Sequence, residues 1–344
     1  MGLEVQVKRL LKGFELDAAF SVQAGTMGIL GASGSGKSMT LRCVAGIEAP
    51  QEGRIALSGR VLYDASKGIA LRPQERRVGY LFQNYALFPR MSVAENIGCA
   101  LPREKRKKSV GALMERFQLL GLEKRYPGQL SGGQQQRVAV ARCLAAAPEA
   151  LLLDEPFSAL DSGMREQMQL ELQRMLQDFG GPVVLVTHDQ REAYHLCQHL
   201  AVFDQGRCIA QGEIKALFAQ PGLVQAARLM GCRNISRARS LGGNRLQALD
   251  WGVELLAAGP APEDTTAVGV RENCLRPVGS PEGVNRFRFA CLERLEEMDA
   301  YSAQVRLGDV QEAASLWARL PKGGGLPAAL SIAPEDVLLL KGEV

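Results

Sequence analysis

Eight residues near the start of the chain combine three glycines with a lysine and a serine in a spacing that suits phosphate binding. The segment reads Gly31, Ala32, Ser33, Gly34, Ser35, Gly36, Lys37 and Ser38, and it follows an apolar run that ends at Leu30. Glycines let backbone N–H groups turn toward an anion, the lysine reaches the β- and γ-phosphates, and the serine hydroxyl binds Mg²⁺. We predict an ATP- and Mg²⁺-binding loop in which Lys37 also serves catalysis. No role is assigned to the next residue, Met39.

Two adjacent carboxylates, Asp154 and Glu155, follow a second apolar run at Leu151–Leu153. Open α/β sheets bind their ligands at this end of the strands. We expect Asp154 to hold Mg²⁺, largely through water, and Glu155 to orient and deprotonate the water that attacks the γ-phosphate. A run ending in acids is a weak signal alone, but beside a phosphate-binding loop it becomes a strong one.

A third segment, Leu130–Gln134, reads Leu-Ser-Gly-Gly-Gln and leads into a helical pattern. Here the chain resembles the ABC ATPase family, whose signature is this sequence. Ser131, Gly133 and Gln134 would form a second phosphate site at a helix N-terminus. The segment lies about 94 residues after Lys37 on a separate helical arm, so one molecule is not expected to bring both to one nucleotide. The resemblance implies a head-to-tail homodimer that encloses two ATP molecules.

Further segments match the family in order along the chain. Gln83 resembles the glutamine that touches Mg²⁺ and opens the helical subdomain, and Ser158–Asp161 resembles the dimer-contacting D-loop. His188 follows Glu155 by 33 residues and resembles the switch histidine that senses the γ-phosphate, which adds a third catalytic residue. Phe14 is the candidate for the aromatic residue that stacks on adenine, although it could equally belong to the core.

The elements that must position these residues form two predicted domains. Residues 1–230 alternate short apolar runs with longer helical patterns, which predicts an α/β fold with a parallel sheet covered on both faces. The resemblance makes this domain a P-loop ABC ATPase with a helical subdomain at about residues 84–147. Residues 234–344 contain short segments separated by Gly, Pro and Asn, which predict a smaller all-β domain. By resemblance this second domain is OB-like and regulatory.

The composition excludes several classes of protein. The 344 residues are 46% hydrophobic and 23% charged, as in soluble globular proteins rather than disordered or collagen-like chains. The net charge of +4, without a basic stripe, argues against nucleic acid as a partner. Eight scattered cysteines predict reduced, mostly buried thiols. No apolar run approaches 18 residues and the first residues do not resemble a signal peptide, so we expect a cytoplasmic protein.

A single cassette followed by a β-rich tail is similar to importer ATPases of the maltose, sulfate and molybdate group. Exporters usually fuse membrane helices, translation-type members carry two cassettes, and DNA-repair members insert a long coiled coil. The interval from Ser38 to Leu130 leaves no room for such an insertion. The resemblance implies integral-membrane permease subunits as partners and, indirectly, a periplasmic or lipid-anchored solute-binding protein. It also implies a peripheral location on the cytoplasmic face of the cell membrane.

The segments Gly53–Asp64, Gly68–Ile69 and Arg72–Tyr80 are similar to molybdate-importer ATPases, which are close to sulfate ones. The resemblance favours an oxyanion, with molybdate first and sulfate or tungstate second. Importers of other solutes and a soluble regulatory ABC ATPase without transport remain alternatives. Tyr85, Leu87 and Phe88 are expected to form an exposed apolar patch that receives the permease, although they could instead pack inside the subdomain.

Overall fold

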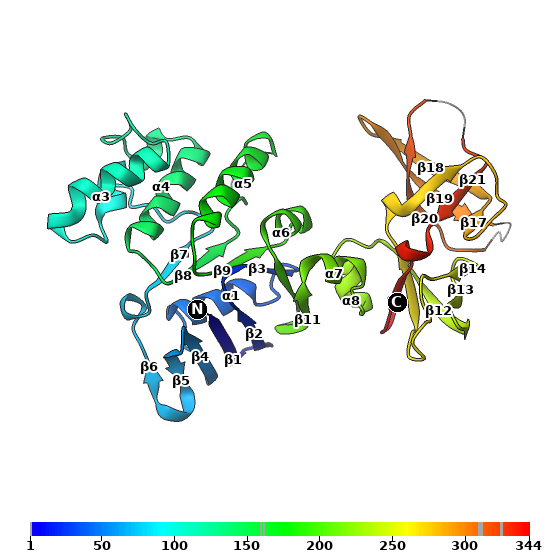
Figure 1. Ribbon diagram of the computed structural model, residues 1–344, viewed down its shortest axis with the longest axis horizontal. Helices are drawn as coiled ribbons and strands as arrows, with labels where there is room; N and C mark the ends of the chain where they lie inside the picture. The colour runs from blue at the N-terminus through cyan, green and yellow to red at the C-terminus, as the bar shows by residue number, and fades with distance from the viewer. Residues whose placement is uncertain (1, 159, 161, 309–311, 324–325) are drawn as a thin grey trace. The chain divides into compact units, whose positions relative to one another are not determined.

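The computed structural model describes residues 2–158, 160, 162–308, 312–323 and 326–344 (Figure 1). Ala159 and Asp161 of the predicted D-loop therefore lie outside the described residues. The chain divides into two compact units, Met1–Ile214 and Lys215–Val344, and each is described by itself. In the part of the chain that the structure describes, no helix is both long enough and apolar enough to cross a membrane.

An eleven-stranded sheet forms the centre of the first unit as described, in the order β6-β5-β4-β1-β2-β11-β10-β3-β9-β8-β7. Its strands are β1 (Leu3–Leu11), β2 (Phe14–Val22), β3 (Gly25–Gly31), β4 (Glu52–Leu57), β5 (Arg60–Asp64), β6 (Ile69–Ala70), β7 (Val78–Leu81), β8 (Ala150–Asp154), β9 (Pro182–Thr187), β10 (His199–Asp204) and β11 (Arg207–Glu213). Strands β10, β3, β9, β8 and β7 pair in parallel, whereas β1 pairs antiparallel with β2 and β4.

The parallel strands β3, β9 and β8 are apolar along their length, and each of them has a neighbouring strand on both sides in the sheet. Every residue of β8 and β9 is buried, and so is every residue of β3 after Gly25. Such continuous burial is typical of a parallel sheet covered on both faces. The carboxyl ends of β3, β7, β8 and β9 meet at one edge of the sheet, so the loops that follow these strands are brought together there.

Helices α1 (Lys37–Ala45), α5 (Ser162–Gln177) and α6 (Gln190–Leu196) contact this sheet. Helices α2 (Val93–Gly98), α3 (Arg103–Arg116) and α4 (Gly132–Ala145) lie between β7 and β8 in the chain and pack on one another (Figure 1). They occupy the interval in which the sequence predicts a helical subdomain. Ser92 starts α2 with a capping box, accepting from the Glu95 N–H while the Glu95 carboxylate accepts from the Ser92 N–H.

The described part of the second unit is built mainly from strands in three sheets, ordered β14-β13-β12-β15-β22, β16-β21-β17 and β18-β19-β20. The strands are β12 (Asn234–Gly242), β13 (Arg245–Ala248), β14 (Val253–Leu256), β15 (Ala267–Val270), β16 (Leu275–Val278), β17 (Arg286–Phe287), β18 (Phe289–Glu296), β19 (Ala300–Leu307), β20 (Leu316–Pro321), β21 (Ala329–Ile332) and β22 (Leu338–Leu340). Trp251, 1% exposed, lies in their common core. This architecture agrees with the predicted all-β, OB-like domain.

Two short helices, α7 (Ile214–Ala219) and α8 (Val224–Leu229), precede the strands of the second unit. The sequence analysis assigns residues 215–230 to the first domain, whereas the structure groups them with the second unit. The guanidinium of Arg271 donates to the carbonyl oxygens of Phe218 and Met230 at 3.0 and 2.6 Å. Val224 and Ala227 pack in one apolar cluster with residues of β15 and β22. These contacts join residues that are far apart in the sequence. They put the boundary between the two units at Ile214, earlier than residue 230, where the change in composition predicts it.

Candidate nucleotide-binding site

The glycine-rich loop joins β3 to α1 in a conformation that requires its glycines. Gly34 and Gly36 have φ values of +80° and +95°, which side-chain-bearing residues rarely adopt. A Cβ atom on Gly31 would lie 2.3 Å from the carbonyl oxygen of Phe203 on β10. Gly36 is the N-cap of α1 and has no side chain to accept from the first-turn N–H groups. The helix N-terminus is therefore a site where an anion can accept these hydrogen bonds.

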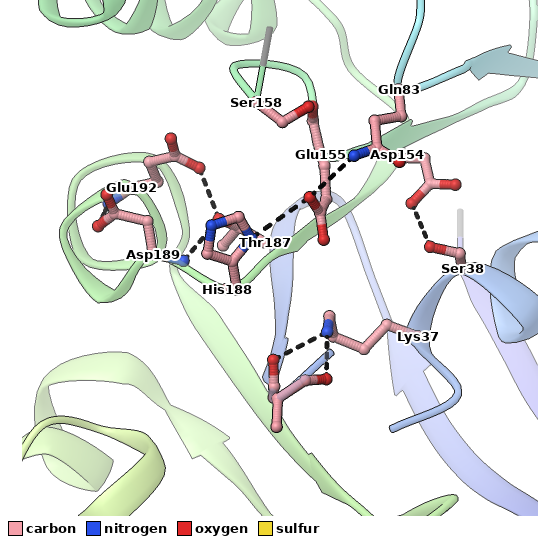
Figure 2. Close-up of polar contacts among 12 residues, drawn as sticks. Lys37, Ser38, Gln83, Asp154, Glu155, Ser158, Thr187, His188, Asp189 and Glu192 are labelled. Atoms are coloured by element: carbon pink, nitrogen blue, oxygen red, sulfur yellow. Dashed lines mark hydrogen bonds and ion pairs between the residues drawn. The ribbon is translucent and has the colours of Figure 1, made fainter. Parts of the chain in front are cut away.

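Lys37 is only 4% exposed and points back into this loop. Its Nζ donates to the carbonyl oxygens of Gly31 and Ala32, both at 2.8 Å (Figure 2). Burial lowers the pKa of Lys37, while the carboxylates of Glu155 and Asp154 oppose that shift. The ammonium group is thus held beside the loop that would surround a phosphate.

Asp154, at the end of β8, is 3% exposed and accepts two hydroxyl hydrogen bonds. Ser38 Oγ donates to Oδ1 at 2.7 Å (Figure 2), and the phenol of Tyr80 on β7 donates to Oδ2 at 2.8 Å. Burial, followed by the neighbouring Asp154 charge, raises the pKa of Tyr80. Tyr80 is not among the residues predicted from the sequence. The strand register is what reveals its role: Tyr80 pairs in parallel with Leu152, so Tyr80 and Asp154 lie on one face of the sheet.

The oxygen donors here fit Mg²⁺. Among the described residues there is no group of three or more His, Cys, Asp and Glu side chains that could hold a metal. Mg²⁺ usually binds through one or two protein oxygens together with phosphate oxygens and water. Ser38 Oγ and Asp154 Oδ1 lie 2.7 Å apart beside the phosphate loop, and Ser38 and Gln83 line one cavity, which Asp154 does not. The assignment of these three residues as Mg²⁺ ligands stays a prediction.

Glu155, His188 and Gln83 converge from the loops that follow β8, β9 and β7 (Figure 2). Glu155 Oε2 accepts from Gln83 Nε2 at 3.3 Å and lies 3.3 Å from His188 Nδ1. Glu155 has a left-handed φ of +45°, and its N–H donates to the carbonyl of Val186 at 3.0 Å. The Ser158 hydroxyl donates to the Glu155 carbonyl at 3.0 Å. The backbone is therefore held so that the carboxylate points toward His188.

The backbone around His188 is fixed by three polar side chains that the sequence analysis did not identify. The Thr187 hydroxyl donates to Glu192 Oε2 at 2.5 Å and accepts from the Asp189 N–H at 2.9 Å. The Asp189 carboxylate is the N-cap of α6 (Figure 2). Burial raises the pKa of Glu192, while the bond from Thr187 opposes that shift. His188 itself has 62% of its side chain exposed and lines the cavity described next.

A cavity of about 790 Å³ collects most of these groups, a size that suits a small-molecule ligand. It is lined by Leu11, Lys12, Phe14, Ser33, Gly34, Gly36, Lys37, Ser38, Met39, Arg42, Gln83, Glu155 and His188. A neighbouring hollow of about 400 Å³ is lined in part by Ala32, Ser35 and again Phe14. The ring of Phe14 touches the loop, since its Cζ would lie 3.1 Å from a Cβ on Gly36. It also packs against the core, and its stacking on adenine stays a prediction.

The signature segment starts α4 and lies apart from this cavity. Ser131 is the N-cap of α4: its hydroxyl accepts from the Gln134 N–H at 3.3 Å, and the Gln134 side chain accepts from the Ser131 N–H at 3.0 Å. Gly133 is buried against α5, where a Cβ would lie 3.1 Å from Met164 Sδ. Within the described residues, none of these three lines the cavity around Lys37.

The expected apolar patch is only partly exposed. Phe88 and Met91 are 46% and 36% exposed, but Tyr85 is 3% exposed and its hydroxyl donates to the carbonyl of Pro156 at 3.3 Å. The expectation that Tyr85 is exposed is therefore wrong. Tyr85 and Ala86 have successive left-handed φ values of +59° and +44°, and this local turn could not be read from the residue types.

Arg142 of α4 holds this turn. Its guanidinium donates to the carbonyl oxygens of Ala86 and Tyr85 at 2.8 and 2.9 Å, and it lies 5.2 Å from the centre of the Phe88 ring. One side chain of the signature helix thus contacts the segment that follows Gln83.

Comparison with known proteins gives matches over the first unit above all. A family model described as ABC transporter matches residues 16–158. The spermidine/putrescine import ATP-binding protein PotA of Acidothermus cellulolyticus is 45% identical over 215 residues, 61% of this chain and 55% of that protein. The molybdenum import ATP-binding protein ModC of Paramagnetospirillum magneticum is 35% identical over 269 residues, 76% of this chain and 74% of that protein. The sulfate/thiosulfate import ATP-binding protein CysA of Thermosynechococcus vestitus is 42% identical over 234 residues, 67% of each chain.

The matched residues span little more than half the length of the PotA relative. Among solved structures, a dimeric ATP-binding cassette in a post-hydrolysis state, bound to ADP and Pi, is 28% identical with a TM-score of 0.52. The likeness covers 62% of this chain and 99% of that cassette. The family model includes the glycine-rich loop, Gln83, the signature segment and both carboxylates, whereas His188 lies beyond it.

Proposed function

We propose that this chain, which belongs to the ABC transporter family of import ATP-binding proteins, is the ATP-hydrolysing subunit of an importer. The observation that carries the proposal is the gathering of Lys37, Ser38, Gln83, Glu155 and His188 around one cavity. A Gly-rich loop at a helix N-terminus suits the phosphates of ATP. The carboxylate and imidazole beyond it suit the activation of water.

Each residue of the candidate site has a defined part in the proposed reaction. Lys37 and the first-turn N–H groups of α1 bind and orient the β- and γ-phosphates. Ser38 and Asp154 would hold Mg²⁺, which neutralises charge on the phosphate oxygens when bound. Glu155 orients the attacking water and accepts its proton, while His188 and Gln83 keep that carboxylate in place from 3.3 Å.

The active unit that we propose is a head-to-tail homodimer. Ser131 and Gln134 do not line the cavity around Lys37, so a single chain offers each ATP only half of the expected phosphate contacts. Ser131 is exposed and Gln134 is half-buried at the N-terminus of α4, which leaves them able to contact a nucleotide held by a second copy. The similar ATP-binding cassette is dimeric in its solved structure, which supports a dimer here.

The proposed membrane partner is a permease that docks on the helices after Gln83. An apolar groove of about 440 Å³ there is lined by Ala94, Glu95, Arg106, Val110, Gly111, Met114, Leu120 and Glu123. The exposed side chains of Phe88 and Met91 belong to the same stretch of chain. An apolar surface of this kind favours a protein partner over solvent. The subunit would therefore lie on the cytoplasmic face of the membrane and receive solute indirectly from a solute-binding protein.

The solute that we propose is an oxyanion, molybdate before sulfate or tungstate. Relatives named for polyamine, molybdenum and sulfate import all match the cassette, so cassette identity does not separate their solutes. The molybdenum relative matches over 269 residues of this chain, a longer stretch than the 215 of the polyamine relative. That longer match supports molybdate, together with the similar segments around Gly53–Asp64.

The catalytic proposal is tested with Glu155→Gln and a mixture of two inactive subunits. Glu155→Gln should still bind ATP, accumulate as a dimer and lose about 10²–10⁴-fold in turnover, because only the base is removed. A Lys37→Ala subunit mixed with a Ser131→Arg subunit should regain activity, since one of the two composite sites keeps both groups. ATP hydrolysis that is independent of protein concentration, in a chain that stays monomeric, would contradict the shared site.

The solute is tested in cells that lack the protein. Molybdenum content should fall when molybdate is supplied at low concentration and recover with excess molybdate. Unchanged molybdenum with a new requirement for a sulfur source would favour sulfate instead. Loss of uptake of an unrelated solute would reject the oxyanion, and unchanged uptake of every solute would favour a soluble regulatory ATPase.

A further inference from the structure

We propose that Tyr80 is a positioning residue for the Mg²⁺-binding carboxylate of Asp154. The inference rests on the proposed function, because it concerns the same ATP site. Tyr80 does not line the cavity described above; it lies on β7, behind Asp154. It acts on the ion only through that carboxylate.

The hydrogen bonds of Asp154 show what Tyr80 supplies. Asp154 is 3% exposed, so its oxygens depend on protein donors rather than on bulk water. The Tyr80 phenol donates to Oδ2 at 2.8 Å and leaves Oδ1 to accept from Ser38 at 2.7 Å. The two oxygens thus have separate partners, and the carboxylate plane is fixed with one edge toward the P-loop serine. Without the phenol, Oδ2 loses its donor and the carboxylate is free to rotate.

The rest of the Tyr80 residue is held independently of its hydroxyl. Its ring lies 4.5 Å from the ring of Phe82, with the two planes at 49°. Its carbonyl accepts from the thiol of Cys143 on α4 at 3.2 Å, and its backbone pairs with Leu152 on β8. Tyr80→Phe therefore keeps the packing and removes the hydrogen bond to Asp154, together with a contact between the phenol and Arg42. The effect on Asp154 is the part that depends on Mg²⁺.

The experiment measures nucleotide binding, not turnover, in a Glu155→Gln background that does not hydrolyse ATP. Binding of a fluorescent ATP analogue is titrated with Mg²⁺ and repeated in EDTA. Tyr80→Phe should raise the Mg²⁺ concentration for half-maximal binding about 3–10-fold, which is less than the full contribution of a hydrogen bond to a charged carboxylate, because Asp154 itself stays in place. Binding in EDTA should be unchanged, because the phenol does not contact the phosphate loop.

Tyr63→Phe is the matched control. Tyr63 on β5 is buried, whereas Tyr80 is half-buried. The Tyr63 hydroxyl donates to the carbonyl of Pro50 at 2.6 Å, and Tyr63 does not line the nucleotide cavity. Its removal should leave the Mg²⁺ requirement unchanged, while Asp154→Asn should raise that requirement more than Tyr80→Phe does. Melting of each variant without nucleotide verifies that it is folded.

The outcomes separate the two proposals. If the chain with native Tyr80 shows no Mg²⁺-dependent ATP binding, the proposed function itself fails. If that chain does bind ATP in an Mg²⁺-dependent way, but Tyr80→Phe has the same Mg²⁺ requirement as native Tyr80, the positioning role is overturned. Equal shifts of the Mg²⁺ requirement in Tyr80→Phe and Tyr63→Phe would mean that Tyr80 has only a general structural role, and would also overturn the proposal.

Discussion

Replacing Arg142 by glutamine tests whether the signature helix holds the segment after Gln83. Arg142 donates to two consecutive carbonyl oxygens, those of Tyr85 and Ala86, from a half-buried position on α4. Both residues have left-handed backbones, a conformation that costs about 1–2 kcal/mol for a residue with a side chain. The turn therefore needs stabilising contacts from outside it, and the Arg142 guanidinium makes them.

The size of the effect follows from these bonds. A hydrogen bond from a charged donor contributes about 1.5–3 kcal/mol net. The lower value applies here because water can reach part of the site, so the two bonds together contribute about 3 kcal/mol. The exposed Phe88 ring adds about 0.5–1 kcal/mol through its cation–π contact. For a unit of this size, the total of about 3.5–4 kcal/mol corresponds to a Tm lowered by about 7–16 °C.

Thermal unfolding of the first unit without nucleotide measures this loss. Arg142→Lys should recover about half of it, because one ammonium group can serve only one of the two carbonyls in this geometry. Arg116→Gln is the control: Arg116 makes an exposed ion pair with Asp178, worth at most about 1 kcal/mol. If Arg142→Gln lowers Tm no more than Arg116→Gln does, the turn is held by other contacts and the reasoning is refuted.

Two further predictions concern single regions of the chain. Tyr85→Asp should unfold or strongly destabilise the first unit in a thermal melt, because it buries a carboxylate where a phenol donates to Pro156. Phe88→Asp should lower Tm by only about 1–4 °C, through loss of its cation–π contact, and should leave basal ATP hydrolysis unchanged while impairing transport. Equal effects of the two substitutions would contradict the difference in their burial. A chain that ends at Ile214 should keep Mg-ATP binding, since the cavity lies within the first unit. It should also aggregate less than a chain that ends at Met230, because in that longer chain the apolar residues Val224 and Ala227 lose their partners on β15 and β22. A folded chain ending at Ile214 that no longer binds ATP would mean that the second unit contributes to the site.

Contiguous motifs were accessible from the sequence because their chemistry depends on neighbours along the chain. The glycines between Gly31 and Gly36, and the pair Asp154–Glu155, need no knowledge of strand order to be recognised. The apolar runs before them also indicate parallel strands. What unites them in one cavity is the general property that parallel strands end at the same edge of a sheet.

Tyr80 and the turn at Tyr85 could not be predicted in the same way. Tyr80 meets Asp154 only because β7 pairs with β8 in one particular register, which involves residues more than 70 positions apart. Tyr85 is buried because two consecutive non-glycine residues are left-handed, against their local preference. The position of the unit boundary depends in the same way on Arg271, whose two partners precede it by 53 and 41 residues.

The place of β3 in the sheet has a consequence for the synthesis of the protein. Both neighbours of β3, β9 and β10, come about 150 residues or more later in the chain. At about 5–20 residues per second, a ribosome exposes this apolar strand for about 8–30 s before its first partner has been made. Nascent chains therefore carry the phosphate loop on an unpaired strand that is open to misassociation. We expect the newly made chain to need a holding chaperone over this interval.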